Sequence, residues 1–141
     1  MIDYSYLVEE ALKAREMAYV PYSKFAVGAA LLCEDGSIIQ GCNIENAAYS
    51  PTNCAERTAF FKAVSEGKME FTAIAVVGGP QGQMPVELIS PCGVCRQVMM
   101  EFCDPTTFEV IVGKSKEEYV VYKLDQLLLA GFSPKNLLKL K

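Results

Sequence analysis

Residues 25–33 read Phe-Ala-Val-Gly-Ala-Ala-Leu-Leu-Cys, a nearly unbroken apolar run in the first quarter of the chain. Such a run, followed at once by polar residues, predicts a β-strand. The polar residues include the pair Asp35-Gly36, which favours a tight turn before Ile38 and Ile39. The sequence therefore predicts a β-hairpin that begins at Phe25 and returns through Ile39.

Helices are expected on both sides of this hairpin. Apolar residues recur at helical spacing over residues 7–18 and the pattern stops at Pro21. Residues 55–65 have a helix-forming composition, and Gly67 is a residue type common just beyond a helix end. This second helix would therefore begin directly after Cys54.

The second half of the chain continues the alternation of helices and strands. We expect a buried strand over residues 71–77, then a loop over residues 78–90, which carry Gly, Pro and Gln without a clear period. A helix should follow as far as about Phe102. The last expected elements are strands at 108–112 and 119–122, a helix at 124–130 and a short amphipathic tail.

This order of elements predicts an α/β fold. We expect a three-layer α-β-α sandwich around a mixed sheet of about five strands, formed as a single domain over residues 1–141.

The composition limits which classes of protein and which kinds of partner are compatible with the chain. Hydrophobic residues make up 51% of the 141-residue chain and charged residues 21%, as in ordinary globular proteins. The net charge is −4 with scattered Lys and Arg, which disfavours a nucleic-acid partner. No apolar run approaches the roughly 18 residues of a membrane span, and residues 1–5 do not resemble a signal peptide. We expect a cytoplasmic protein without a membrane partner.

Three of the six cysteines have the spacing of metal ligands, and the chain has no histidine. Cys54 stands before a predicted helix, and Cys92 and Cys95 form a C-x-x-C motif at the start of another. Zinc–thiolate bonds of about 2.3 Å in a tetrahedron require sulfurs roughly 3.8 Å apart, which this arrangement can supply. Three protein ligands leave the fourth position open for water, as in catalytic zinc sites.

Other interpretations of the cysteines remain open at this point. The C-x-x-C motif is also compatible with a closed structural zinc site or with a redox dithiol. Disulfides are not expected in a reducing cytosol. Cys33, Cys42 and Cys103 are interpreted as small buried apolar residues.

Four motifs resemble those of a known family. They are Tyr-Ser-Lys-Phe-Ala-Val-Gly-Ala-Ala at 22–30, Gly-Cys-Asn-Ile-Glu-Asn-Ala at 41–47, Cys-Ala-Glu-Arg-Thr-Ala at 54–59 and Pro-Cys-Gly-Val-Cys at 91–95. Together they resemble the free-nucleoside cytidine deaminases, which share the C-x-E and P-C-x-x-C signature of the zinc nucleobase deaminases. The resemblance runs from about residue 5 to residue 137. It implies the short, homotetrameric type with three cysteine ligands and one Zn²⁺ per chain.

The resemblance implies that Glu56 is the catalytic residue. Its position two residues after Cys54 argues against its being a fourth ligand on a regular helix. The matching glutamate in deaminases takes a proton from water and passes it to N3 of the pyrimidine. It then helps to protonate the departing amine, so that ammonia leaves without a covalent enzyme intermediate.

Substrate-binding positions follow from the same resemblance. Asn43 and Glu45 would bind the 3′-hydroxyl of the sugar, and their alternation with Ile44 places both on one side of an extended segment. The resemblance also implies that Phe25 packs against the base and that the main chain of Ala55 contacts the pyrimidine edge. It further implies that Tyr49 is a pocket residue and that Phe132 enters a neighbouring subunit's active site.

Arg57 is a candidate for tuning the metal. Three thiolates and one Zn²⁺ sum to −1, against +2 for three neutral histidines, so the site needs compensating positive charge. Helix N-termini supply part of it, and an arginine that donates to the sulfurs would withdraw further electron density. Arg57 is the nearest candidate, and Arg96 is the second.

The sequence thus predicts hydrolytic deamination of cytidine and 2′-deoxycytidine to uridine and 2′-deoxyuridine plus ammonia, in pyrimidine salvage. One alternative keeps the zinc chemistry but changes the substrate to a related aminonucleoside such as a nucleoside antibiotic, a nucleotide or a base. Another is a non-catalytic structural zinc module that binds partners. The preference between cytidine and deoxycytidine is not predicted, because both carry the same base and 3′-hydroxyl.

Overall fold

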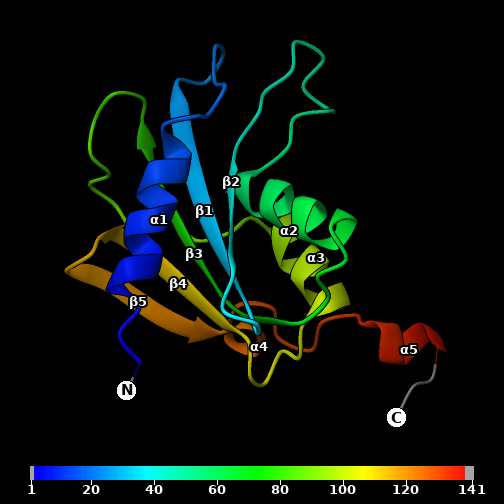
Figure 1. Cartoon of the computed structure of the whole chain (residues 1–141). Helices are drawn as coiled ribbons and strands as arrows, with labels where there is room; N and C mark the ends of the chain where they lie inside the picture. Colours follow the sequence, from blue (N-terminus) through cyan, green and yellow to red (C-terminus); the bar gives the residue numbers. More distant parts are fainter. Residues whose placement is uncertain (1, 139–141) are drawn as a thin grey trace.

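Residues 2–138 are described by a computed structural model, in which five strands form one mixed sheet (Figure 1). The strands are β1 (Phe25–Cys33), β2 (Ile38–Cys42), β3 (Phe71–Pro80), β4 (Glu109–Ser115) and β5 (Glu118–Lys123). Their order across the sheet is β2-β1-β3-β4-β5. β3 and β4 are parallel, and the other neighbouring pairs are antiparallel.

Helices cover both faces of this sheet, as the sequence predicts. They are α1 (Ser5–Arg15), α2 (Ala55–Ser65), α3 (Gly93–Phe102), α4 (Leu124–Leu127) and α5 (Pro134–Leu138). α1 packs on one face through Leu7, Val8 and Ala11, and α2 and α3 pack on the other (Figure 1). The predicted three-layer arrangement is therefore confirmed. None of the helices within residues 2–138 has the length and apolar character needed to cross a membrane.

Successive residues of the central strands feed the two cores in turn. On β3, Ala73, Ala75 and Val77 face α1, whereas Ile74 and Val76 face α2 and α3. This alternation follows from the two-residue period of a strand.

Two glycines allow helices to approach the sheet very closely. A Cβ atom on Gly28 would lie 2.1 Å from the Ala11 carbonyl oxygen, so only glycine lets α1 pack at this depth on β1. A Cβ atom on Gly41 would lie 2.4 Å from the Ala55 carbonyl oxygen. The first turn of α2 is thereby held directly against β2, next to Asn43.

Some element ends differ from the prediction. β3 continues to Pro80 because its last residues pair with β1, with Gly79 opposite Ala26 and Pro80 opposite Phe25. The predicted loop therefore begins three residues later than expected. α1 ends at Arg15 instead of Ala18, and α4 ends at Leu127. Ala130 has a φ of +55°, in the left-handed region, so a helix could not continue through it.

Candidate metal centre and active site

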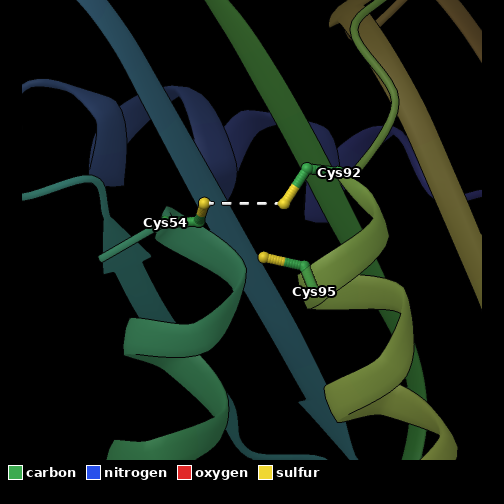
Figure 2. Close-up of side chains that lie close together, drawn as sticks. All are labelled: Cys54, Cys92 and Cys95. Carbon is green, nitrogen blue, oxygen red and sulfur yellow. Dashed lines mark hydrogen bonds between the residues drawn. The ribbon is translucent and has the colours of Figure 1, made fainter. Parts of the chain in front are cut away.

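The three predicted ligands come together at the start of two helices. Cys54 is the N-cap residue of α2, Cys92 is the N-cap residue of α3, and Cys95 lies in the first turn of α3. Figure 2 shows the three sulfurs turned toward a common point between the two helices. The Sγ atoms of Cys54 and Cys92 are 3.8 Å apart, and all three Sγ atoms lie within 4.8 Å of one another. These separations fit a tetrahedral zinc ion with bonds of about 2.3 Å.

The electrostatics of this cluster favour thiolate at Cys54. Hydrogen bonding by Cys95, followed by Arg57, lowers the pKa of Cys54 well below its usual range. The same hydrogen bond to Cys54, together with burial, raises the pKa of Cys95. Cys54 is therefore the more readily ionised of the two thiols, and Cys95 keeps its proton. A bound cation displaces such protons, because thiols coordinate metals as thiolates.

Arg57 lies against the cluster. Its Nη2 donates to the Cys54 Sγ at 3.2 Å, and its Nε is buried without a protein acceptor among the described residues. Burial disfavours the charged guanidinium, but hydrogen bonds to Cys54 and Cys95 outweigh this effect and raise its pKa. Arg96, the second candidate, has its hydrogen bonds elsewhere, to Pro91, Ser90 and Leu127.

Glu56 occupies the same cavity as the cysteines. Its side chain is only 4% exposed and lines a cavity of about 150 Å³ together with Asn43, Cys54 and Cys92. Burial raises the pKa of Glu56 to about 7, and the nearby Cys54 thiolate adds to the effect. A carboxyl group with this pKa can both accept and release a proton near neutral pH.

Asn43 is held by β1 on the rim of this cavity. Its Oδ1 accepts a hydrogen bond from the Val27 N–H, and its Nδ2 donates to the Phe25 carbonyl oxygen, both at 2.9 Å. Ala55 also lines the cavity, at the first position of α2. Two of the predicted substrate-binding residues therefore adjoin the cysteine cluster.

Glu45 and Tyr49 line a separate hollow of about 400 Å³. The Glu45 Oε1 accepts from the N–H groups of Tyr22 and Ser23, at 3.0 and 3.1 Å. Tyr49 is 71% exposed and has a φ of +63°, an uncommon conformation for an aromatic residue. Its ring meets that of Tyr22 edge-on. Glu45 and Asn43 thus both turn toward residues 22–27 but line different hollows.

Phe25 and Phe132 do not line the cavity of Glu56. Phe25 lines a third hollow, of about 180 Å³, which shares Ile89 with the cavity of Glu56. Phe132 is 59% exposed, and its carbonyl oxygen accepts a hydrogen bond from the Gln97 side chain. Within the described single chain, Phe132 therefore presents its ring to the surface.

Sequence reasoning missed several wall residues of the Glu56 cavity. Ile89 and Ser90 reach it from the irregular segment before α3, and Val27 and Val76 reach it from the sheet. No local pattern marks the first two. Their proximity to Cys92 in the sequence was the only available signal.

A metal-binding thiolate cluster beside a buried carboxyl group is the arrangement of a metal-dependent hydrolytic enzyme. A family model, described as the cytidine and deoxycytidylate deaminase zinc-binding region, matches residues 1–112. The chain belongs to this family.

Relatives and solved structures agree with this placement. The chain is 54% identical over 139 residues to a cytidine deaminase of Sporosarcina psychrophila, with 96% of each chain covered. It is 49% identical over 136 residues to that of Halalkalibacterium halodurans, covering 96% of this chain and 98% of the relative. The crystal structure of cytidine deaminase from Burkholderia pseudomallei superimposes with a TM-score of 0.83 at 47% identity, covering 93% of this chain and all of that one.

Proposed function

We propose that the chain catalyses the hydrolytic deamination of cytidine and 2′-deoxycytidine to uridine and 2′-deoxyuridine, with release of ammonia. The observation that carries this proposal is the cluster of Cys54, Cys92 and Cys95 beside the buried Glu56. The cytidine deaminase names of relatives at 54% and 49% identity support the substrate. They also favour it over a structural zinc module or an antibiotic deaminase.

The reaction requires a nucleophile and a proton carrier in one cavity. Cys54, Cys92 and Cys95 would hold Zn²⁺, which when bound lowers the pKa of water and so makes a nucleophile available at neutral pH. Glu56 accepts the proton that this water loses and delivers it to N3 of the pyrimidine. After water adds to C4, Glu56 carries the second proton to the amino group. Ammonia leaves, C4 becomes a carbonyl carbon, and Glu56 returns to its initial state.

Arg57 compensates the negative charge of the three thiolates in this proposal. Its Nη2 hydrogen bond to Cys54 withdraws electron density from the sulfur. The N-termini of α2 and α3 add partial positive charge at the same point. Arg57 can act on the sulfur in this way without contacting the substrate.

The sugar of a free nucleoside would be bound by Asn43 and Glu45. Hydrogen bonds from Ser23 and Tyr22 lower the pKa of Glu45, so its carboxylate is ionised at neutral pH. An ionised carboxylate accepts a hydrogen bond from a 3′-hydroxyl but repels a 3′-phosphate. The Glu45 carboxylate would therefore select free nucleosides over nucleic acid, which agrees with the net charge of −4.

The remaining substrate contacts are assigned by position. Phe25 would pack against the base, the main chain of Ala55 would bind the pyrimidine edge, and Tyr49 would complete the pocket. Tyr49 supports this assignment through its uncommon backbone conformation, because strained residues cluster at functional sites.

We also propose a homotetramer in which Phe132 enters a neighbouring subunit's active site. The large exposed fraction of Phe132 supports this, because an aromatic ring of this size gains from being covered. We place the enzyme in the cytoplasm, in pyrimidine salvage, as a single catalytic domain. The six cysteines are free, which suits a reducing compartment.

A panel of nucleosides tests the proposal directly. The zinc-loaded protein is assayed by the fall in absorbance on deamination, with cytidine, 2′-deoxycytidine, deoxycytidylate and an aminonucleoside antibiotic. We expect turnover of the first two and little of the others. Turnover of the antibiotic alone would identify a different deaminase. No turnover of any compound at full zinc occupancy would favour the structural zinc module.

A further inference from the structure

Arg96 binds three separate segments of the chain around α3. Its Nε donates to the Pro91 carbonyl oxygen at 2.7 Å, and its Nη2 donates to the Ser90 hydroxyl at 3.0 Å. Its Nη1 donates to the Leu127 carbonyl oxygen at 2.6 Å. Every partner is an uncharged oxygen atom, so this half-buried guanidinium acts through the positions of its donors and not through an ion pair.

The first two partners lie directly before the zinc ligand Cys92. Pro91 is the residue that Cys92 follows, and Ser90 lines the cavity of Glu56. Cys92 is the N-cap of α3 but forms no side-chain capping bond, because its sulfur is turned toward Cys54. Among the described residues, Arg96 therefore supplies the side-chain hydrogen bonds that hold the peptide before this ligand.

The third partner lies at the end of α4. Leu127 is the last residue of this four-residue helix, and carbonyl groups at a helix end have no helical N–H partner. The next side chain on α3, Gln97, donates to the Phe132 carbonyl oxygen at 2.9 Å. Two consecutive residues of α3 thus hold both ends of the segment 127–132.

Only arginine can make the Arg96 contacts at once. The guanidinium has five N–H donors in a rigid planar fork, and here the Nε, Nη1 and Nη2 atoms each bind a different oxygen. A lysine would place its donors on one nitrogen atom. Charge and geometry can therefore be separated by substitution.

We propose that Arg96 is a positioning residue that couples the zinc centre to the C-terminal segment 124–132. It holds the Pro91–Cys92 peptide so that the Cys92 sulfur stays within reach of the metal, and it anchors the segment that leads to Phe132. Because coupling between two sites is reciprocal, bound zinc orders residues 124–132, and an intact anchor slows the loss of zinc. The identity of the metal rests on the proposed function, whereas the positioning role of Arg96 rests on the hydrogen bonds of this chain.

The test compares three variants of the zinc-loaded protein, Arg96→Lys, Arg96→Ala and Gln97→Ala. Zinc release to a coloured chelator gives one readout, and hydrogen exchange of residues 124–132, with and without zinc, gives the other. For both Arg96 variants we expect release about tenfold faster or more. Exchange should rise in residues 124–132 but not in α1, which lies on the opposite face of the sheet.

Gln97→Ala is the matched control. It removes the bond to Phe132 but leaves Arg96 intact, so zinc release should stay within about twofold of wild type. Exchange should increase only near residue 132. If Arg96→Ala does not fold, Arg96→Lys and the milder Ser90→Ala provide the test, the latter with a smaller acceleration of zinc release.

If Arg96→Lys released zinc at the wild-type rate, the positioning role would be overturned. The same conclusion would follow if hydrogen exchange of residues 124–132 in the wild-type protein were the same with and without zinc. The result is independent of the deamination assay. A protein that fails to deaminate cytidine but shows the expected release would contradict the proposed function alone. Full deamination with unaltered release in the variants would contradict this inference alone.

Discussion

Glu56 combines burial with proximity to a thiolate, and both keep its proton available near neutral pH. We predict that Glu56→Gln binds zinc and folds normally, because glutamine preserves the size and shape of the side chain. It cannot carry a proton, so kcat should fall by about 10²–10⁴-fold or more. Metal analysis, circular dichroism and steady-state kinetics on the same preparation measure the three properties. A kcat within tenfold of wild type would exclude the proton-transfer role.

Arg57 is predicted to act on the metal ligands and not on the fold. Arg57→Ala removes the donor to the Cys54 sulfur, so kcat/KM should fall by about 10- to 100-fold with zinc still bound. Arg57→Lys should recover part of the loss, because it keeps the charge without the planar fork. Nearly normal kcat/KM in the alanine variant would return Arg57 to the status of an ordinary helix charge.

The main features of the site were predictable from the sequence because ligand chemistry restricts them strongly. Three cysteines without a histidine, two of them in C-x-x-C, left few other metal-binding combinations, and the structure brings these three sulfurs together. Arg57 donates to the Cys54 sulfur at 3.2 Å, but its role in tuning the metal stays a prediction. The separate hollows of Asn43 and Glu45 depend on tertiary packing, and so do the three partners of Arg96. No local pattern encodes either.

At the level of elements, the depth of helix packing depends on glycine. We predict that Gly28→Ala lowers the free energy of unfolding by about 1–3 kcal/mol or more, because the new Cβ would overlap backbone atoms of Ala11 and Arg15 that cannot rotate away. Denaturant unfolding measures the change.

Gly93→Ala is the control, since a Cβ there meets nothing within 4 Å. Its effect on unfolding should be small or slightly stabilising. Equal effects of the two substitutions would contradict the close approach of α1 and β1.

Long apolar or periodic segments were predicted correctly as elements, whereas their ends were not. Residues 25–33 form β1 with the expected bounds because nine residues of one character leave little ambiguity. Gly78, Gly79 and Pro80 have the composition of a loop but extend β3, because their backbones pair with β1. Backbone pairing does not require side chains of a given type. This kind of extension is therefore invisible in single-sequence patterns.

At the scale of the whole molecule, a polar network ties the residue before α1 to the last two strands. The Tyr4 hydroxyl donates to the Glu109 Oε1 at 2.6 Å, and the Lys123 Nζ donates to Oε2 at 3.1 Å. The Tyr4 N–H also donates to the Tyr119 hydroxyl. The hydrogen bond from Tyr4, assisted by Lys123, lowers the pKa of Glu109.

This network predicts a pH dependence of stability. A pKa lowered by folding means that ionised Glu109 stabilises the native state above its ordinary pKa of about 4.3, and that this contribution is lost as the pH falls. The difference in unfolding free energy between wild type and Glu109→Gln should be largest near pH 7 and shrink below about pH 4. Release of zinc in acid affects both proteins alike. A difference that grows on acidification would show that the assigned direction is wrong.

The most direct test of the central claim is reconstitution of the metal-free protein with zinc while cytidine deamination is followed. We expect turnover to rise in proportion to added zinc and to stop rising at about one ion per chain. Cys103→Ala should behave like wild type, whereas Cys54→Ala should neither retain zinc nor gain activity, because Cys54 belongs to the cluster and Cys103 does not. Deamination by the metal-free protein, or a fully zinc-loaded protein that leaves cytidine unchanged, would contradict the account.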